Sequence, residues 1–436
     1  MGIYLDNAAT SYPKPEAVYR AVDDCLRNVG ASSGRGAYRR ALAADQLVYG
    51  ARRSLARLFN VRDVSRIVFT GNVTESLNLA MKGLLRPDDH VVTTGMEHNA
   101  VWRCLKVLEA KRGLRVTAVP CGPDGTLDPE QVIAAFRPET RLVVMIHASN
   151  VTGTLLPVTE VGAAAARRGI PLLVDAAQTA GVYPVDVEKM NISLLAFTGH
   201  KGLLGPPGTG GLYVAPGIAL EPLKEGGTGG ESILERQPDT LPDRFEAGTL
   251  NVPGIAGLGA AADFILAEGV ERIRAREEEL TAYALGALRR LDGITVYGPG
   301  DPARQVAVIS INVLDMKPEE VALLLDTRYG IEMRAGLHCA PAAHRTIGTV
   351  ERGTLRLGLG YFNTRGEIDS LAEALREIIR ERLKTTGSQG GPGELIHPPE
   401  KKSFYRRAGT RGKGGHPHVP GGDRDRFYSA LPGRRE

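Results

Sequence analysis

Short apolar segments alternate with helical patterns through the first half of the chain. Between about residues 65 and 215, the segments with the length and composition of strands are Arg66–Thr70, His90–Thr94, Arg115–Val119, Leu142–His147, Pro171–Val174, Leu194–Thr198 and Gly211–Val214. Stretches with apolar residues at helical spacing lie between several of them, at Glu75–Leu85, Ala100–Arg112 and Thr159–Arg168. Strands that are apolar throughout, rather than alternating, are typical of a mostly parallel sheet with helices on both faces. We therefore predict an α/β fold in which functional side chains follow the carboxyl ends of the strands.

The pattern changes near residue 260, where a long helix, short strands and a final helix follow one another. The final helix has a clear start, because Thr364 and Glu367 have the spacing of a capping box. Apolar residues then recur at helical spacing, at Ile368, Leu371, Leu375 and Ile378. We predict an N-terminal segment (1–15) that packs with the small domain, a large domain (16–259), a small α+β domain (260–384) and a tail (385–436).

The overall composition is that of an ordinary globular protein. Of the 436 residues, 42% are hydrophobic and 24% are charged. No apolar run is long enough to span a membrane, and Asp6 and Asn7 interrupt the start where a signal peptide would need an apolar core. We therefore expect no membrane partner and a cytoplasmic location.

The net charge of +4 is concentrated in the tail. Residues 386–436 contain 10 Lys and Arg against 5 Asp and Glu, together with 11 Gly, 6 Pro and few aliphatic residues. Such a segment cannot bury enough apolar surface to fold by itself, so we predict that it is disordered. Its basic pairs are compatible with contact to nucleic acid or to an acidic partner. A solvated extension explains them as well, and we do not expect a nucleic-acid partner.

None of the four cysteines belongs to a CxxC motif, so the sequence indicates neither a disulfide framework nor a zinc ribbon. They are Cys25, Cys104, Cys121 and Cys339. His338, Cys339 and His344 lie close together in the sequence, but no fourth ligand follows at a recognisable spacing. We expect no metal site.

The strongest chemical signal is a lysine that follows a buried strand. Thr198-Gly199-His200-Lys201 comes directly after an apolar run, which is a poor place for a solvated charge. The position suits an amine that must lose its proton to form a Schiff base. The preceding strand delivers Asp175, and a carboxylate there is the partner that a pyridinium nitrogen needs. A Schiff-base lysine with an aspartate for the ring nitrogen indicates pyridoxal 5′-phosphate (PLP) as cofactor.

Two predicted helix starts supply the rest of such a site. Asn72-Val73-Thr74-Glu75 and Met96-Glu97-His98-Asn99 each open a helix directly after a strand. A hydroxyl and free backbone N–H groups at a helix start form a ready phosphate site. Gly257–Ala262 matches a dinucleotide-binding pattern, but it follows Pro253-Gly254 rather than a strand. We interpret it as tight helix packing.

Arg356 and Cys339 complete the candidate set. In Leu355–Gly360 the leucines share one strand face and leave Arg356 opposite, with two glycines. A planar guanidinium beside such space suits a bidentate carboxylate, although an edge-strand arginine in solvent would show the same pattern. Cys339 lies in a loop after Arg334 and His338, where cationic or polarising neighbours would favour the thiolate. We interpret the other three cysteines as structural.

Together these motifs resemble the class V aminotransferase family, and within it the group II (SufS-like) cysteine desulfurases and selenocysteine lyase-like proteins. The resemblance extends from Tyr4 to about Leu383. The segments that carry it are Tyr4–Ala9, Thr74–Leu79, Glu97-His98, Ser149–Gly153, Asp175–Gln178, Thr198–Lys201, Arg244–Thr249 and Arg334–Ala340. It implies a PLP-dependent transferase of fold type I, with a large and a small domain, that forms a homodimer.

The resemblance also implies a role for each candidate residue. The catalytic residues are Lys201, which carries PLP and moves protons, His98, which stacks on the ring, and Cys339. The cofactor-binding residues are Val73, Thr74, His98, Asn150, Asp175 at the ring nitrogen, Gln178 at the phenolic oxygen, Thr198, His200, Lys201 and, from a second subunit, Thr249. The substrate-binding residues are Asn150, Arg334 and Arg356, with Arg356 paired to the substrate carboxylate.

The implied reaction converts L-cysteine to L-alanine. The Cys339 thiolate attacks the substrate sulfur and keeps it as a persulfide for an acceptor protein. Two positions differ from the group II pattern: Leu337 stands where a second histidine often precedes the cysteine, and Val73 replaces a frequent threonine. Three hypotheses stay open at this point: a cysteine desulfurase, a selenocysteine lyase or related β-eliminating enzyme, and a PLP-binding sulfur-transfer scaffold with low turnover. Because Cys339 and Arg356 are both present, we favour a competent desulfurase.

Overall fold

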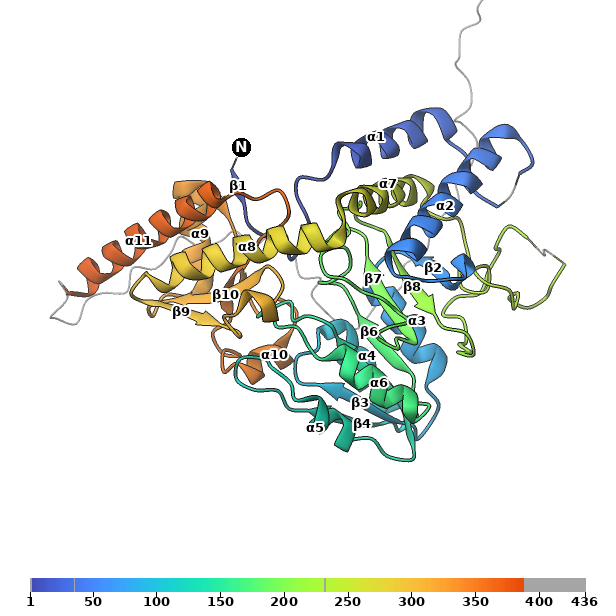
Figure 1. Ribbon diagram of the computed structural model, residues 1–436, viewed down its shortest axis with the longest axis horizontal. Coiled ribbons are helices and arrows are strands. Elements are labelled where there is room, and N and C mark those ends of the chain that lie inside the picture. The colour runs from blue at the N-terminus through green and yellow to red at the C-terminus, as the bar shows by residue number, and fades with distance from the viewer. Residues whose placement is uncertain (1, 35, 231–232, 388–436) are drawn as a thin grey trace, which may run out of the picture. The chain divides into compact units, whose positions relative to one another are not determined.

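The computed structural model describes residues 2–34, 36–230 and 233–387 of the chain (Figure 1). Residues 1–386 belong to one compact unit. The tail that the sequence predicts to be disordered lies, from residue 388 onward, outside the described residues.

A seven-stranded sheet forms the centre of the N-terminal two-thirds of this unit. Its strands in spatial order are β2 (Ile67–Thr70), β8 (Gly210–Val214), β7 (Leu194–Thr198), β6 (Leu172–Asp175), β5 (Thr140–Ile146), β3 (His90–Thr94) and β4 (Arg115–Val119). Neighbouring strands are parallel except β8, which is antiparallel to both β7 and β2. The predicted α/β fold with a mostly parallel sheet is confirmed. Every residue of β3, β6, β7 and β8 is buried, as apolar strands covered on both faces require.

Helices cover both faces of this sheet (Figure 1). On one face, the apolar side chains of α3 (Val73–Leu84) and α4 (Asn99–Arg112) form a common core with the strands. A second core on the other face includes residues of α2 (Arg39–Leu58), α6 (Val158–Arg167) and α7 (Val252–Glu268). Shorter elements complete this part: α1 (Glu16–Asp24), the π-helical turn η1 (Cys25–Val29), the 3-10 turn η2 (Val64–Arg66) and α5 (Pro129–Ala134).

Helix α7 packs against α1 and α2 at van der Waals distance because its glycines have no side chain. A Cβ atom at Gly257 would lie 2.7 Å from Val22 Cγ2 and from Pro206 Cγ, and one at Gly259 would lie 2.9 Å from Ala51 Cβ. The interpretation of this glycine-rich stretch as tight helix packing is confirmed.

A four-stranded antiparallel sheet forms the C-terminal part. Its strands in spatial order are β12 (Arg334–Gly336), β13 (Thr354–Gly358), β10 (Val308–Val313) and β9 (Ile294–Tyr297). The core beside it includes residues of α8 (Val270–Arg289), α9 (Pro318–Tyr329) and α11 (Arg365–Gly387). The remaining short elements are η3 (Pro302–Arg304) and α10 (Pro341–Thr346). The predicted capping box is confirmed, since the Thr364 N–H donates to Glu367 Oε2 at 2.7 Å and the Glu367 N–H donates to Thr364 Oγ1 at 3.3 Å.

The start of the chain joins this C-terminal part. Strand β1 (Ile3–Tyr4) pairs in parallel with β11 (Ile331–Glu332), and Asp6 then forms an isolated bridge with Gly358 at the end of β13. Helix α7 continues without a break through residue 259, so the boundary expected at 259/260 and the other domain limits stay predictions. Among the helices of the described ranges, none alone is long and apolar enough to cross a membrane. Helices α7 and α8 meet that criterion only as a pair, with an 82° bend between them.

Candidate active site

Four neighbouring parallel strands deliver candidate residues to one edge of the large sheet. Lys201 follows β7, Asp175 is the last residue of β6, Asn150 follows β5 and His98 follows β3. The adjacency follows from the topology, because the carboxyl ends of parallel strands lie on the same side of a sheet. Residues dispersed over about a hundred positions therefore meet at one place.

Lys201, which is half-buried, and the buried Asp175 influence each other's pKa. Burial lowers the pKa of the Lys201 ammonium to about 8, with Arg356 adding to the effect and Asp175 opposing it. Asp175 is 1% exposed, and burial raises its pKa. The hydrogen bond that its Oδ1 accepts from the Ala177 N–H at 2.9 Å and the charge of Lys201 both act in the opposite direction. At pH 7 roughly a tenth of such a lysine is the neutral amine, far more than for an ordinary lysine, and the aspartate gains from any further cation placed beside it.

His98 is a neutral imidazole at the start of α4. Its Nδ1 accepts the Ala100 N–H at 3.1 Å, so the ring proton resides on Nε2. Burial lowers its pKa to about 4, and the positive charge of Lys201 contributes to the shift. The structure thus places a flat, uncharged ring beside the reactive amine, as stacking on a cofactor ring would require.

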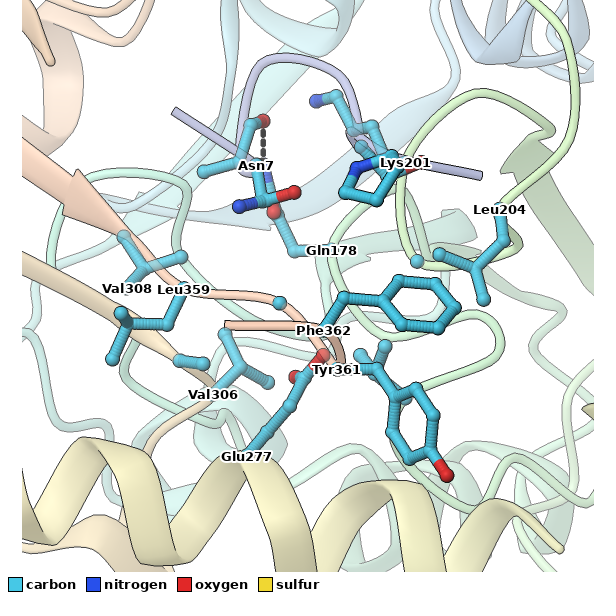
Figure 2. Close-up of a pocket in the computed structure, with 17 residues that line it drawn as sticks. Asn7, Gln178, Lys201, Leu204, Glu277, Val306, Val308, Leu359, Tyr361 and Phe362 are labelled. Atoms are coloured by element: carbon cyan, nitrogen blue, oxygen red, sulfur yellow. Dashed lines mark hydrogen bonds between the residues drawn. The ribbon is translucent and has the colours of Figure 1, made fainter. Parts of the chain in front are cut away.

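Gln178 faces the same space from the loop after β6. Its Nε2 donates to the Ala8 carbonyl at 3.0 Å, which leaves the second N–H of the amide for another acceptor (Figure 2). Gln178 and Lys201 also line a cavity of about 40 Å³, with Glu277 of α8 on its far wall (Figure 2). That volume admits about one water molecule, so this cavity adjoins the site without being able to hold a cofactor.

The first turn of α3 retains donors for a phosphate. Asn72 Oδ1 caps the helix by accepting the Glu75 N–H at 3.0 Å. Val73 is half-buried and Thr74 is exposed, and within the described residues the Thr74 hydroxyl has no hydrogen bond. The remaining N–H groups of this turn, with that hydroxyl, match the phosphate site predicted from the sequence.

The other three phosphate candidates differ in their surroundings. Thr198 is buried, and within the described part of the chain its hydroxyl makes one hydrogen bond, a long one of 3.4 Å to the Thr209 carbonyl. His200 is half-buried, and burial lowers its pKa to about 4, so it is neutral. Thr249 is exposed, and it lines a cavity of about 210 Å³ with Gly71 at the start of α3 in its own chain.

Arg356 is held for a carboxylate ligand. It lies on β13, between β12 and β10, and is 2% exposed, so the alternative of a solvated edge-strand arginine is wrong. Nη2 donates to Asp6 Oδ1 at 2.7 Å and Nη1 donates to the Asn150 carbonyl at 3.1 Å. Its Nε and Asn150 Oδ1 are buried without a partner among the described residues. Arg334 pairs with Arg356 in register across β12 and β13, but its side chain is exposed.

Cys339 is the exposed cysteine of the four, at the end of a short loop between β12 and α10. Its carbonyl accepts the Asn99 N–H at 2.9 Å, and the preceding carbonyl, of His338, accepts from Asn150 Nδ2 at 2.7 Å. Both His338 and Cys339 have left-handed backbone conformations, with φ of 48° and 57°. Two consecutive non-glycine residues keep this conformation only where their surroundings fix it.

The neighbours of the cysteines refine the expectations from the sequence. His338 Nε2 donates to the Thr354 carbonyl at 3.0 Å, and burial lowers the pKa of the ring to about 2. His338 is therefore neutral and supplies no positive charge to the thiol. Burial raises the pKa of Cys104 to about 11 and that of Cys121 to about 12, as expected for structural cysteines.

Sequence reasoning missed several residues that organise the site. Asp6 and Glu97 belong to the segments that carry the family resemblance, but the sequence indicated no role for either. In the structure, Asp6 pairs with Arg356, and Glu97 is completely buried directly before His98. Glu246 forms a buried ion pair with Arg52, at 2.6 and 2.8 Å, that anchors the segment leading to Thr249. A signal for Arg52 was present, since it occupies the apolar face of α2.

The assembled set fits PLP. It offers an amine that loses its proton readily, a buried carboxylate for a ring nitrogen, a flat neutral ring and a helix start for a phosphate. These are Lys201, Asp175, His98 and the first turn of α3. The unpartnered Arg356 Nε adds a place for the carboxylate of a substrate.

Comparison with known proteins gives one consistent result. The family model described as "Aminotransferase class-V" matches residues 3–371. A probable cysteine desulfurase of Methanothermobacter thermautotrophicus is 38% identical over 388 residues, covering 86% of this chain and 94% of the relative. One of Halalkalibacterium halodurans is 35% identical over 384 residues, covering 86% and 92%.

Solved structures agree. An apo cysteine desulfurase from Thermococcus onnurineus NA1 superposes with a TM-score of 0.83 at 33% identity, over 87% of this chain and 95% of that one. The cysteine desulfurase CsdA of Escherichia coli, in an S-sulfonic acid form, gives 0.79 at 28% identity, over 87% and 95%.

Proposed function

Because this chain belongs to the aminotransferase class-V family, we propose that it is a PLP-dependent cysteine desulfurase that receives the sulfur of L-cysteine on Cys339. One observation carries the assignment. The loop with the exposed thiol is hydrogen-bonded to Asn99 and Asn150. These two residues follow strands of the large sheet at the same carboxyl ends as Lys201 and Asp175. The acceptor of the sulfur and the groups that would activate the substrate are thus parts of one site.

PLP, when bound, withdraws electrons from the substrate Cα and so weakens the bonds next to it. Lys201 Nζ would attach the cofactor and then carry the proton that leaves Cα, a task that suits an amine with a pKa of about 8. Asp175 would keep the ring nitrogen protonated, because a buried carboxylate gains most from a cation at hydrogen-bond distance. His98 would cover the ring and exclude water.

Arg356 would orient the substrate through its α-carboxylate, using the Nε that lacks a partner within the described chain. The Cys339 thiolate would then attack the substrate sulfur. An S–S bond forms, the Cβ–S bond breaks, and its electron pair stays with the carbon, which takes up a proton to give alanine. The products are alanine and an enzyme persulfide, so electrons balance without an external oxidant.

Four finer assignments belong to this proposal. We place the chain with the group II desulfurases, because the loop that bears Cys339 is short and held by three hydrogen bonds: its His338 and Cys339 carbonyls accept from Asn150 and Asn99, and His338 Nε2 donates to the Thr354 carbonyl. We also propose a homodimer in which Thr249 completes the phosphate site of the other subunit, a sulfur-acceptor protein as partner, and a cytoplasmic location.

Incubation of the purified, PLP-loaded protein with L-cysteine and with L-selenocysteine tests the function. We expect alanine from L-cysteine, and one additional sulfur atom on the peptide that contains Cys339 when the reaction is quenched early. Alanine from L-selenocysteine alone would assign the chain to the selenocysteine lyases. No alanine from either amino acid, with PLP bound and an acceptor present, would refute an enzymatic function.

A further inference from the structure

Glu97 is a buried carboxyl group in the turn between β3 and α4, directly before His98. Its side chain is 0% exposed. Its Oε1 accepts two hydrogen bonds, from Thr94 Oγ1 at 2.7 Å and from the Ile146 N–H at 3.0 Å. The first bond closes the turn on itself, and the second connects it to another strand.

That second bond ties His98 to the strand beside Asp175. Ile146 is the last residue of β5 and is the register partner of Asp175 on β6. In a regular sheet, the Ile146 N–H would donate to a backbone carbonyl of a neighbouring strand. Here it donates to the side chain of Glu97. This carboxyl oxygen therefore helps to set the position of the His98 turn relative to Asp175.

The same turn also touches the loop of the reactive cysteine. The Asn99 N–H donates to the Cys339 carbonyl at 2.9 Å, and Asn150, four residues beyond Ile146, donates to the His338 carbonyl at 2.7 Å. Glu97 joins the two segments that hold this loop, one after β3 and one after β5. Its position between them connects His98, Asp175 and Cys339.

The second oxygen of Glu97 argues that the group is uncharged. Oε2 is buried and has no partner within the described ranges of the chain. Among the described residues, the titratable groups that interact with Glu97 are Asp175 on β6 and Cys121 in the loop after β4, and neither is a cation. Burial raises the pKa of Glu97 to about 8, and the charge of Asp175 adds to this rise. A neutral Glu97 adds no second negative charge beside the carboxylate of Asp175.

We propose that Glu97 is a positioning residue that, as a neutral acid bonded to the Ile146 N–H, sets the spacing between His98 and Asp175 in which the cofactor ring lies. The proposal rests on the PLP chemistry proposed above. It adds a role for a residue that touches neither cofactor nor substrate.

Three variants of the PLP-loaded protein test it: Glu97→Gln, Glu97→Ala and Glu97→Asp. Gln keeps the acceptor oxygen and is neutral, so from pH 6 to 7, where the Glu97 carboxyl is protonated, we expect the PLP absorbance of Glu97→Gln to match that of the wild type. Ala removes the acceptor and Asp is too short to reach Ile146. In both variants, we expect the pH titration of the PLP absorbance to have a midpoint that differs from that of the wild type. PLP release should be at least about tenfold faster, as expected when a buried hydrogen bond is lost. Hydrogen exchange of the peptide containing Ile146 should accelerate in Ala and Asp and stay slow in Gln.

Glu109→Gln on α4 is the matched control, because Glu109 pairs with Lys106 on the surface of the same helix. It should match the wild type in every measurement. A wild-type absorbance titration and exchange rate in Glu97→Ala, or in Glu97→Asp if the Ala variant does not fold, would overturn the positioning role. A PLP absorbance of Glu97→Gln that differs from the wild type between pH 6 and 7 would overturn the neutral state. If the wild type takes up no PLP, the proposed function fails, and exchange at Ile146 in the PLP-free variants still decides whether Glu97 holds the strand.

Discussion

At the scale of single residues, the site depends on removing water from groups that water would otherwise keep charged. Lys201, His98 and His338 all have lowered pKa values for this reason, whereas burial raises that of Glu97. The result is two neutral imidazoles, a neutral carboxyl group and a lysine that loses its proton readily, all around the buried carboxylate of Asp175. Such a set can exchange protons without first shedding a hydration shell.

The lowered pKa of Lys201 predicts how PLP uptake depends on pH. Only the neutral amine attacks the PLP aldehyde, and with a pKa of about 8 the neutral fraction rises roughly tenfold per pH unit below 8 and levels off above it. The rate of absorbance change after mixing PLP-free protein with PLP should follow this curve. The same measurement with Nα-acetyl-lysine corrects for the ionisation of PLP itself. A rate that keeps rising to pH 10 would mean that Lys201 has an ordinary pKa.

Cys339 decides the reaction type. Cys339→Ser should keep PLP and bind L-cysteine, since those steps use other residues, while sulfur release falls at least about a hundredfold because a hydroxyl is a poor nucleophile toward sulfur. Sulfide or acceptor-bound sulfur measured with L-cysteine checks the loss, and Cys121→Ser serves as the control. Turnover of L-selenocysteine should survive in part. Full desulfurase activity in Cys339→Ser would point to simple elimination.

The sequence identified candidate residues that directly follow a strand. It did not identify residues whose role comes from an ion pair with a residue far away in the sequence. Lys201 and Asp175 are recognisable because a charged residue directly after an apolar strand is unusual. Asp6 pairs with Arg356 across 350 positions, and Arg52 pairs with Glu246 across 194, so neither pair has a local pattern. The roles themselves, including those of His98 and Cys339, stay predictions until the variants are measured.

At the scale of elements, the strands of the large sheet were predictable because burial on both faces makes them apolar from end to end. His90–Thr94, Arg115–Val119 and Leu194–Thr198 were placed with the bounds that the structure shows. The two-residue strands β1 and β11 had no pattern to detect, because pairing between distant segments alone defines them. The conformation of the Cys339 loop was equally hidden, since three hydrogen bonds to remote groups hold it.

The packing of α7 gives a prediction at this scale. Gly259→Ala should lower the free energy of unfolding by roughly 1–3 kcal/mol, because the new methyl group would meet Ala51 of α2 at 2.9 Å, where no flexible side chain can yield. Gly286→Ala in α8 is the control, since nothing lies within 4 Å of the added atom. There, alanine should stabilise the helix by up to about 1 kcal/mol. Thermal melts of both variants suffice, and equal shifts would contradict the packing argument.

At the scale of the whole molecule, the central question is whether each site belongs to one chain or two. Thr249 is exposed and near the α3 start of its own chain, whereas the resemblance to the family assigns it to the partner's phosphate. The two possibilities differ in what a mixed dimer can do.

Mixing two inactive variants separates these possibilities. Lys201→Ala cannot attach PLP, and Thr249→Asp places a negative charge against the phosphate. If Thr249 acts across the interface, refolding the two together should restore up to about half of the wild-type PLP content per mixed dimer, because one site then has both native residues. Sedimentation identifies the dimer and borohydride reduction traps the bound PLP. No recovery in a proven mixed dimer would place Thr249 in the site of its own subunit.

The loop that bears Cys339 has a kinetic consequence. The three hydrogen bonds at His338 and Cys339 would keep the proposed persulfide in place, so the acceptor of its sulfur must diffuse to the protein. The catalytic cycle then separates into a half that depends on cysteine and a half that is bimolecular in the acceptor. Steady-state velocities measured against both concentrations should give parallel double-reciprocal lines, and the persulfide form should accumulate whenever the acceptor is scarce.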